Sequence, residues 1–356
     1  MIVVDAHEDI AYNALCYGRD YRTNAWEKRR IEANMEAVTK SGEATIGLPD
    51  AILGRVAVIF ATLFVAPAKP QPTPWDRLQY KTPQEAEQLA LQQIDYYRRI
   101  ADECDKVQII ESQAHLDSVL ATWEPDKELA DHIQGLVILM ENADPIVEPK
   151  QFEEWFERGV RIVGPAWAGT RYTGGTGQPG PLTDLGRELL EHMESLNAIL
   201  DLSHMAEAAF LESLDRYNGQ IIASHSNPRH FVNSDRHLSD EMIRRLAERD
   251  GVVGIVLFNR FLKEGWLKAD GKAAVSFSVP LEAIDYVCQL TGSAAHVAIG
   301  SDFDGGFGAE SIPNDIETVT DLWYIGEALK TRGYSEHDVA AIMGGNMLGK
   351  LRQSLP

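Results

Sequence analysis

Histidine and carboxylate side chains in this chain recur directly after short apolar segments. His7 and Asp9 form the first pair and follow the apolar residues 2–4, which are typical of a buried strand. Because residues i and i+2 of an extended segment point to the same side, one imidazole and one carboxylate lie together just beyond this strand. Such a pair can hold a metal ion, but taken alone it is explained more simply by a hydrogen bond to a neighbouring loop.

Four further predicted strands end in residues of the same types. They are Glu141 after residues 135–140, His204 after 199–202, His225 after 220–223 and Asp302 after 296–299. Each has a structural explanation of its own, such as a helix cap for Glu141 or a turn before Gly305 for Asp302. Five strand ends that all carry such residues are improbable as independent accidents, so we predict a metal site. The other seven histidines lie mostly in predicted helices or loops and are interpreted as surface or structural residues.

The donor types indicate the kind of metal. Imidazole and carboxylate ligands without a thiolate suit Zn²⁺, and Mn²⁺, Co²⁺ or Fe²⁺ would also accept them. Five ligands are too many for one tetrahedral ion that keeps an open position, but they suffice for two ions if a carboxylate bridges them. Two ions roughly 3.5–4 Å apart can hold a hydroxide between them and supply a nucleophile at neutral pH. The arrangement therefore favours hydrolytic chemistry.

The elements that must position these residues alternate between strands and helices along the chain. Strands are predicted at residues 2–4, 55–66, 135–140, 160–163, 199–202, 220–223, 252–257 and 296–299, with 107–110 as an extra candidate. Amphipathic helices lie between them, and Ser112, Thr183 or Asp184, and Ser239 are typical N-caps. This alternation predicts a parallel sheet with crossover helices, and about eight strands favour a (β/α)₈ barrel of the TIM type.

A barrel would explain how residues about 295 positions apart can act together. The carboxyl ends of all its strands meet at one face, where barrels of this kind place their chemistry. We expect one domain over residues 1–356, with additional helices and loops at that face, including a long loop at residues 164–181. An open doubly wound sheet is the alternative. It is disfavoured because neither G-x-G-x-x-G nor G-x-x-x-x-G-K-[ST] follows any predicted strand.

Composition restricts the class of protein. The 356 residues are 44% hydrophobic and 24% charged, as in ordinary globular proteins, and the formal net charge of −21 argues against a nucleic-acid partner. Cys16, Cys104 and Cys288 are far apart and odd in number, which fits a reducing compartment. The sequence contains neither a recognisable leader nor an apolar stretch of the roughly 20 residues that span a membrane. We therefore expect a cytoplasmic protein without a membrane partner.

Several longer segments resemble the membrane dipeptidase (renal dipeptidase) family, the M19 metallopeptidases of the amidohydrolase superfamily. They are VDAHEDI, ILMEN, PLTDLGRELLEHMESLNAILDLSHM, IIASHSNPR, DRHLSDEMIRRLAERDGVVGIV, VAIGSDFDGG and MGGNMLGKL. The resemblance covers nearly the whole chain. It implies a zinc-dependent enzyme that hydrolyses dipeptides, including those with a C-terminal D-residue, by attack of a hydroxide held between two zinc ions. It also implies a small-molecule substrate and a homodimer.

The resemblance assigns a role to each matching metal-type residue. It implies that His7 and Asp9 bind one zinc ion and that His204 and His225 bind the second. Glu141 would then bridge the two ions.

The resemblance also implies two residues that act on the substrate. Asp302 matches the family's acid/base aspartate, which handles protons as the peptide bond breaks. Arg236 matches the arginine that pairs with the free carboxylate of a dipeptide, a group that suits a planar guanidinium. An ion pair of Arg236 with Asp235 or Asp240 is the structural alternative. Asp304 is interpreted as a turn residue rather than a catalyst.

One position departs from the family. An alignment without gaps from Gly159 places Trp167 where mammalian members have a histidine that assists the substrate carbonyl. An indole N–H is a single neutral donor, so Trp167 is a candidate substrate-binding residue that suggests a different substrate shape. It keeps an alternative open, namely another binuclear-metal amidohydrolase acting on N-acyl amino acids, lactones or cyclic amides. A metal-binding protein without activity is a further alternative, but such a protein would not need the proton shuttle that Asp302 implies.

Overall fold

A computed structural model describes residues 1–356, with the exception of the side chain of residue 37. Its centre is a ring of eight parallel strands. They are β1 (Val3–Glu8), β2 (Val56–Leu63), β6 (Gln134–Met140), β7 (Val160–Val163), β10 (Ile199–Asp201), β11 (Ile221–Ala223), β12 (Val252–Ile255) and β13 (Val297–Ile299). The first strand pairs with both β2 and β13, and β2 pairs with β6, so the eight strands close on themselves. The predicted (β/α)₈ barrel is confirmed.

The barrel strands are largely apolar and are buried on both faces. Every residue of β2 and of β6 is buried. Alternate side chains enter different cores, because successive residues of a strand point to opposite faces. Ile59 and Ala61 pack between the barrel and the helices, whereas Val58 and Phe60 pack in a second core that also contains Met347. Such strands are expected for a parallel sheet that helices cover.

The extra strand candidate is present but is not one of the eight. β5 (Val107–Ile109) pairs with the first half of β6, with Val107 opposite Gln134. β7 pairs with the second half of β6, with Met140 opposite Val163. β2 pairs with one edge of β6 along most of its length. β5 and β7 therefore share the other edge, with β5 beside the start of β6 and β7 beside its end.

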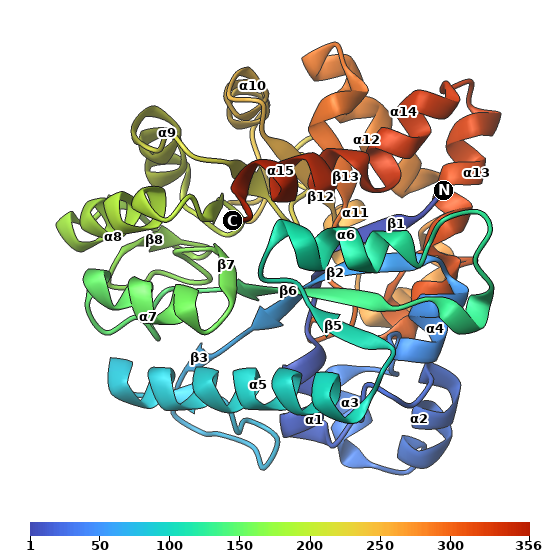
Figure 1. The fold of residues 1–356 in the computed structure, drawn as a ribbon, viewed down its shortest axis with the longest axis horizontal. Coiled ribbons are helices and arrows are strands. Elements are labelled where there is room, and N and C mark those ends of the chain that lie inside the picture. The colour runs from blue at the N-terminus through green and yellow to red at the C-terminus, as the bar shows by residue number, and fades with distance from the viewer.

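Helices surround the barrel, as Figure 1 shows: α5 (Pro83–Glu103), α6 (Gln113–Ala121), α7 (Phe152–Glu157), α8 (Asp184–Ser195), α9 (Glu207–Arg216), α10 (Asp240–Glu248), α12 (Ser278–Thr291), α13 (Trp323–Thr331), α14 (Glu336–Ala340) and α15 (Asn346–Ser354). The predicted caps Ser112, Thr183 and Ser239 each accept a hydrogen bond from the backbone N–H three residues later. These side chains satisfy donors that the first turn of a helix leaves free.

The C-terminal helix α15 fills the end of the barrel where the strands begin. Met347 and Leu351 of α15 belong to the inner core. Gly344, just before α15, packs against Ile2 and Val4 at the start of β1. The opposite end, where the strands finish, is left for the metal-type residues.

The prediction of a long loop at residues 164–181 is wrong in part, because this segment contains a hairpin. β8 (Thr173–Gly175) pairs antiparallel with β9 (Gln178–Leu182). A Cβ atom on Gly174 would lie 2.2 Å from the backbone nitrogen of Gly180. Glycine therefore permits the close approach of these two strands. The Gly, Thr and Pro content of the segment by itself indicates an irregular loop.

The long apolar run at residues 55–66 ends as a strand at Leu63. The side-chain amide of Gln93 replaces a neighbouring strand as the hydrogen-bond partner of Phe64. It accepts the N–H of Phe64 at 3.0 Å and donates to the carbonyl oxygen of Phe64 at 2.9 Å. Beyond this point, β3 (Ala66–Pro67) pairs with β4 (Gln79–Tyr80).

The connection between β1 and β2 is helical. It contains α1 (Ile10–Tyr17), α2 (Ala25–Glu32), α3 (Glu36–Ser41) and α4 (Leu48–Leu53). A further short helix, α11 (Asn259–Leu262), follows β12. Of the helices that the structure describes, none combines the length and the apolar character needed to cross a bilayer.

Candidate metal centre

The structure brings the six strand-end residues together at the carboxyl end of the barrel. They are His7 and Asp9 at the end of β1, Glu141 after β6, His204 after β10, His225 after β11 and Asp302 after β13. Three overlapping groups have their ligand-type atoms within 4.8 Å of one another: His7 with Asp9 and Glu141, Glu141 with His204 and His225, and His7 with His225 and Asp302. Barrel closure thus places residues from both ends of the chain in one cluster.

Three of these side chains have the spacing of a coordination shell. The Nε2 atoms of His204 and His225 lie 3.0 Å apart. They lie 3.3 Å and 3.4 Å, respectively, from Oε1 of Glu141. A tetrahedron with zinc–nitrogen bonds of about 2.0–2.1 Å has edges of about 3.3–3.4 Å. The triangle formed by the three atoms therefore fits one face of a tetrahedral zinc site.

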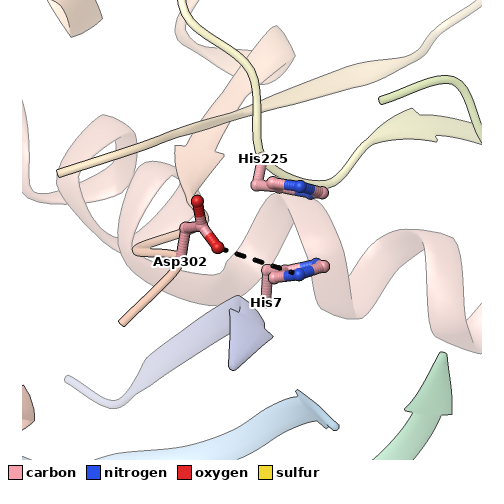
Figure 2. A group of neighbouring side chains, drawn as sticks. All are labelled: His7, His225 and Asp302. Atoms are coloured by element: carbon pink, nitrogen blue, oxygen red, sulfur yellow. Dashed lines mark ion pairs between the residues drawn. The ribbon is translucent and has the colours of Figure 1, made fainter. Parts of the chain in front are cut away.

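His7 lies on the other side of the Glu141 carboxylate. Its Nε2 atom is 3.5 Å from Oε2 of Glu141 and 4.0 Å from Oδ1 of Asp302. Figure 2 shows its ring stacked on that of His225, with Asp302 facing it from the side; the ring centroids are 3.6 Å apart. His7 is fully buried, yet neither ring nitrogen has a hydrogen-bond partner among the described residues. A buried imidazole without a partner is unusual, and a metal ion would satisfy it.

Hydroxyl groups hold two of the candidate ligands in place. Thr62 of β2 donates a hydrogen bond of 2.5 Å to Oδ1 of Asp9. Thr176, in the turn of the β8–β9 hairpin, lies 3.0 Å from Nδ1 of His204 through its hydroxyl oxygen. Each contact fixes a side chain while leaving its other polar atom available. The hairpin that the sequence did not predict therefore supports the site.

His225 is oriented by a two-step hydrogen-bond relay. The hydroxyl of Ser224 donates to Oδ2 of Asp201 at 2.5 Å, and its oxygen lies 2.8 Å from Nδ1 of His225. Because the hydroxyl proton is directed to the carboxylate, the oxygen accepts the proton on Nδ1. The lone pair of Nε2 is then free for a metal ion.

A matching carboxylate–serine pair supports the opposite side of the cluster. Asp5 accepts hydrogen bonds from the Ser301 hydroxyl at 2.5 Å, the Ser301 N–H at 2.8 Å and the His7 N–H at 3.3 Å. None of these four residues, Asp5, Asp201, Ser224 and Ser301, is among the residues that the sequence predicts for the site. The available signal was a carboxylate at the end of an otherwise apolar strand, two or three residues before a histidine.

Two site residues have left-handed backbone conformations. The φ angles of His204 and Asp302 are 66° and 60°. Such a conformation costs roughly 1 kcal/mol or more for a residue with a side chain, and it occurs mainly where the surroundings enforce it. Gly305 packs so closely that a Cβ atom there would lie 2.1 Å from Oδ1 of Asp302. The turn after β13 thus needs glycine at this position to hold the Asp302 carboxylate.

The buried carboxylates of the cluster repel one another, and burial together with this repulsion shifts their pKa values. Burial raises the pKa of Asp302 well above its usual value, and the carboxylates of Asp9 and Glu141 add to this effect. Burial, together with Glu141, raises the pKa of Asp9 to about 7. Burial alone would lower the pKa of His7, but the surrounding carboxylates raise it to about 9. A divalent cation would relieve this repulsion and stabilise the ionised carboxylates.

Arg236 lies beside the cluster in the segment after β11. Its Nη2 donates to the backbone oxygen of His225 at 2.7 Å and its Nη1 to the hydroxyl of Ser226 at 3.3 Å. The residue is only 6% exposed, and its Nε–H has no hydrogen-bond partner among the described residues. The alternative partners are engaged elsewhere, because Asp235 accepts the N–H of Gly177 and Asp240 accepts the hydroxyl of Tyr286.

A cavity of about 720 Å³ connects the cluster with Arg236 and Trp167. Asp9, Glu141, His204 and Asp302 line it as well. The ring of Trp167 lies 6.2 Å from that of His204 and 5.2 Å from that of Phe64, measured between centroids. A cavity of this size accommodates a small-molecule ligand.

Asp304 lies apart from this cavity and has a structural role. Its Oδ1 accepts hydrogen bonds of 2.7 Å from both the N–H and the hydroxyl of Thr45. Its Oδ2 lies 3.5 Å from the guanidinium of Arg19. These contacts join the turn after β13 to the segment between β1 and β2.

Sequence relatives of this chain include both uncharacterised proteins and dipeptidases. It is 29% identical over 256 residues to the uncharacterised protein in the pqqA 5' region of Klebsiella pneumoniae, with 68% of this chain and 91% of that protein covered. It is 30% identical over 176 residues to the dipeptidase tcpJ of Claviceps purpurea, with 48% of this chain and 38% of that protein covered.

Solved structures share the whole fold. The dipeptidase AC, a metallopeptidase of family M19, superposes with a TM-score of 0.78 at 24% identity, covering 100% of this chain and 99% of that chain. A metallopeptidase from Rhodobacter sphaeroides, solved with a phosphinate mimic of the dipeptide L-Ala-D-Ala, gives 0.77 at 23% identity and covers 99% of each chain. The probable dipeptidase PvdM of Pseudomonas aeruginosa gives 0.80 at 21% identity, covering 99% of this chain and 95% of that one.

A protein-family model shows the family to which the chain belongs. The model of the membrane dipeptidases, peptidase family M19, matches residues 1–354. The match includes every strand of the barrel and every residue of the metal-type cluster. The chain therefore belongs to the membrane dipeptidase family, and by that membership it is an M19 metallo-dipeptidase.

Proposed function

We propose that this enzyme hydrolyses dipeptides with the help of two zinc ions. In this proposal His7 and Asp9 bind one ion, His204 and His225 bind the other, and Glu141 bridges them. The observation that carries the proposal is the division of the Glu141 carboxylate. Its Oε1 atom lies 3.3 Å from His204 and 3.4 Å from His225, whereas Oε2 lies 3.5 Å from His7. A carboxylate that turns one oxygen to each group of ligands is suited to bridge two cations.

The metals and the chain divide the chemistry between them. When bound, the zinc ions would provide a hydroxide at neutral pH and polarise the peptide carbonyl. Asp302 is the proposed acid/base group, which takes up the proton of the attacking hydroxide as its oxygen adds to the carbonyl carbon. It returns that proton to the amine nitrogen as the C–N bond breaks. Its burial and its position 4.0 Å from His7 support this role.

Arg236 is the proposed anchor for the free carboxylate of the dipeptide. Two of its N–H groups hold the guanidinium against the protein, and the unpartnered Nε–H shows that its donors are not exhausted. A buried guanidinium in a cavity next to hydrolytic groups is suited to bind a planar carboxylate through paired hydrogen bonds.

Dipeptides with a D-residue at the C-terminus belong among the proposed substrates. The support is indirect and comes from the Rhodobacter sphaeroides metallopeptidase, which was solved with a mimic of L-Ala-D-Ala. A carboxylate anchor and an acid/base group fix the two ends of the C-terminal residue whichever configuration its Cα atom has.

The test is hydrolysis of L-L and L-D dipeptides by the enzyme prepared without metal and then supplied with zinc. We expect turnover only after zinc is added and saturation at two zinc ions per chain, measured by elemental analysis. Zinc-loaded enzyme without turnover on any dipeptide would contradict the proposed substrate. Full activity with one ion per chain would contradict the bridged pair.

Trp167 supports a second candidate, hydrolysis of an N-acyl amino acid, lactone or cyclic amide. Its ring lies in the cavity beside His204, at the position where the family resemblance leads us to expect a carbonyl-binding histidine. The same zinc-loaded enzyme should be tested on N-acetyl amino acids and on a γ-lactone. A value of kcat/KM on these above that on every dipeptide would favour this candidate.

A further inference from the structure

We propose that the cavity selects dipeptides whose C-terminal residue carries a large apolar side chain. This inference rests on the proposed dipeptidase function and concerns the same site. It is based on an aromatic wall, which we define as Phe258, Phe261, Trp266 and Phe307. All four residues line the cavity, and they come from the segments after β12 and β13.

The rings of the aromatic wall pack on one another. Phe258 stacks on Phe307 with centroids 4.2 Å apart and planes at 8°. Phe258 also lies 5.0 Å from Phe261 and 6.2 Å from Trp266, in edge-to-face arrangements. Rings that support one another in this way form a fixed apolar surface.

The aromatic wall runs from the carboxylate anchor to the acid/base group. At one end, the guanidinium carbon of Arg236 lies 5.4 Å from the centre of the Phe261 ring. At the other end, Phe307 is joined to Asp302 through a tight turn in which the N–H of Gly305 donates to the backbone oxygen of Asp302 at 3.0 Å. Gly305 and Gly306 line the cavity between them, so only backbone separates the wall from the acid/base group there.

The chemistry of a dipeptide places its C-terminal residue along this wall. The leaving amine and the free carboxylate are both attached to the Cα atom of that residue. In the proposed mechanism the amine faces Asp302 and the carboxylate faces Arg236. The Cα atom therefore lies between the two ends of the aromatic wall, and the side chain that it carries is the one nearest to the rings.

The wall favours apolar side chains because burial of a charge against aromatic rings is costly. A charged side chain would lose its water without gaining a hydrogen bond from Phe258, Phe261 or Phe307. The cation–π attraction of a lysine to these rings is weaker than the hydration that its ammonium group loses. An apolar side chain gains from burial, by about fourfold in kcat/KM for each buried methylene group. Leucine and phenylalanine should therefore be preferred to glycine, and aspartate and lysine should be disfavoured.

A second aromatic group provides an internal control. Tyr12, Phe64 and Trp167 line the same cavity, and Phe64 lies 5.4 Å from Tyr12 and 5.2 Å from Trp167 between ring centroids. Trp167 places this second group beside His204, whereas the aromatic wall lies beside Arg236. Changes in it should affect the N-terminal residue of the substrate more than the C-terminal one.

The experiment measures kcat/KM of the zinc-loaded enzyme for Ala-Gly, Ala-Ala, Ala-Leu, Ala-Phe, Ala-Asp and Ala-Lys. We expect Ala-Leu and Ala-Phe to exceed Ala-Gly by at least about tenfold, and Ala-Asp and Ala-Lys to fall below Ala-Ala. Hydrolysis with a flat profile, or with a preference for a charged C-terminal residue, overturns this inference alone. Absence of hydrolysis across the whole series overturns the dipeptidase function together with the inference.

Two variants of Phe258 test whether the aromatic wall causes the preference for an apolar C-terminal residue. Phe258→Ala should lower the ratio of Ala-Leu to Ala-Gly at least about threefold, whereas Phe258→Leu should keep most of it. Phe64→Ala is the matched control, in which this ratio should be retained. An unchanged ratio in folded Phe258→Ala enzyme overturns the assignment. If that variant does not fold, as judged by circular dichroism, the profile of the wild-type enzyme still decides the inference.

Discussion

The hydroxyl oxygen of Ser224 lies 2.8 Å from Nδ1 of His225, and this contact leaves Nε2 as the ring nitrogen that faces Glu141 and His204. The direction of the relay follows from Asp201, whose buried carboxylate can only accept the hydroxyl proton at 2.5 Å. Ser224 is therefore the acceptor for the imidazole. The orientation of a candidate metal ligand that follows β11 thus depends on a carboxylate at the end of β10.

Replacement of Ser224 by alanine should weaken metal binding. The variant loses the acceptor that holds the proton on Nδ1 of His225, and changes of this kind typically cost about 10- to 100-fold in metal affinity. The measurement is competition for zinc with a chromogenic chelator. Ser301→Ala is the matched control, because its hydroxyl bonds Asp5 and the N–H of Phe303. An equal loss of affinity in both variants would mean that the imidazole contact itself is unimportant.

Glu141→Gln should reduce the zinc content from two ions per chain to one or none. The amide lacks the negative charge, and its nitrogen cannot act as a ligand. One of the two proposed ions, either that of His204 and His225 or that of His7 and Asp9, therefore loses an oxygen ligand. We expect kcat to fall at least about 100-fold. Elemental analysis of the purified variant checks the stoichiometry. Retention of two tightly bound ions would rule out Glu141 as the bridge.

Asp302→Asn should separate proton transfer from metal binding. The amide keeps the size of the side chain but cannot take up a proton, so kcat should fall by about 100-fold or more. The zinc content should persist, since the other ligand-type residues are unchanged. Both quantities can be measured on the same preparation. Turnover equal to that of the wild type would remove Asp302 from the mechanism.

Arg236→Lys should lower kcat/KM for dipeptides by about 10- to 100-fold, because a single ammonium cannot reproduce the paired hydrogen bonds of the guanidinium. Dipeptide amides, which lack the free carboxylate, test whether the loss comes from the contact between Arg236 and that carboxylate. The wild-type enzyme should prefer the free acid, and the variant should lose most of that preference. A preference that survives the substitution would indicate that another group binds the carboxylate.

Lys28 should make the stability of the fold depend on pH in the alkaline range. It is buried, and its Nζ donates to the backbone oxygen of Ile46 at 2.8 Å. Burial lowers the pKa of Lys28 from 10.5 to about 8, although Asp304 opposes this shift. Between these two values the unfolded chain binds more protons than the folded one, so stability rises with pH across this window and levels off above it.

The expected gain attributable to Lys28 is about 2 kcal/mol in the free energy of unfolding between pH 7.5 and 9.5. It can be measured by urea denaturation of the wild type and of Lys28→Met at both values of pH. The difference between the two proteins should shift by this amount in favour of the wild type as pH rises. A constant difference would show that Lys28 does not titrate as inferred.

Much of the barrel could be predicted because its signals are local. The four residues of β7, three of them apolar, lie between Gly159 and Gly164 and form a strand at the predicted positions. Continuous apolar runs followed by histidine or carboxylate residues are visible in any short window of the sequence, and the barrel fold directs their ends to one face. The roles of these residues, the extent of the domain, the cytoplasmic location and the homodimer stay predictions.

Other features depend on contacts between segments that are distant in the sequence. The partner of Ser224 is decided by the pairing of β10 with β11. The close approach of Gly174 to Gly180 is decided by a hairpin that the composition does not indicate. The sequence shows Trp167 as a departure from the family, but the position of its ring beside His204 and Phe64 is determined only by the fold.

The sequence by itself determined which residues end the strands and which chemistry their types allow, because hydrophobic periodicity and donor type are properties of neighbouring residues. The tertiary structure decided how those residues are oriented and which surfaces adjoin them. The aromatic wall joins segments after β12 and β13 with Arg236 after β11, and such a surface exists only once the barrel has closed and the loops have packed. A side chain's partner depends on the path of every segment around it, which no short stretch of sequence specifies.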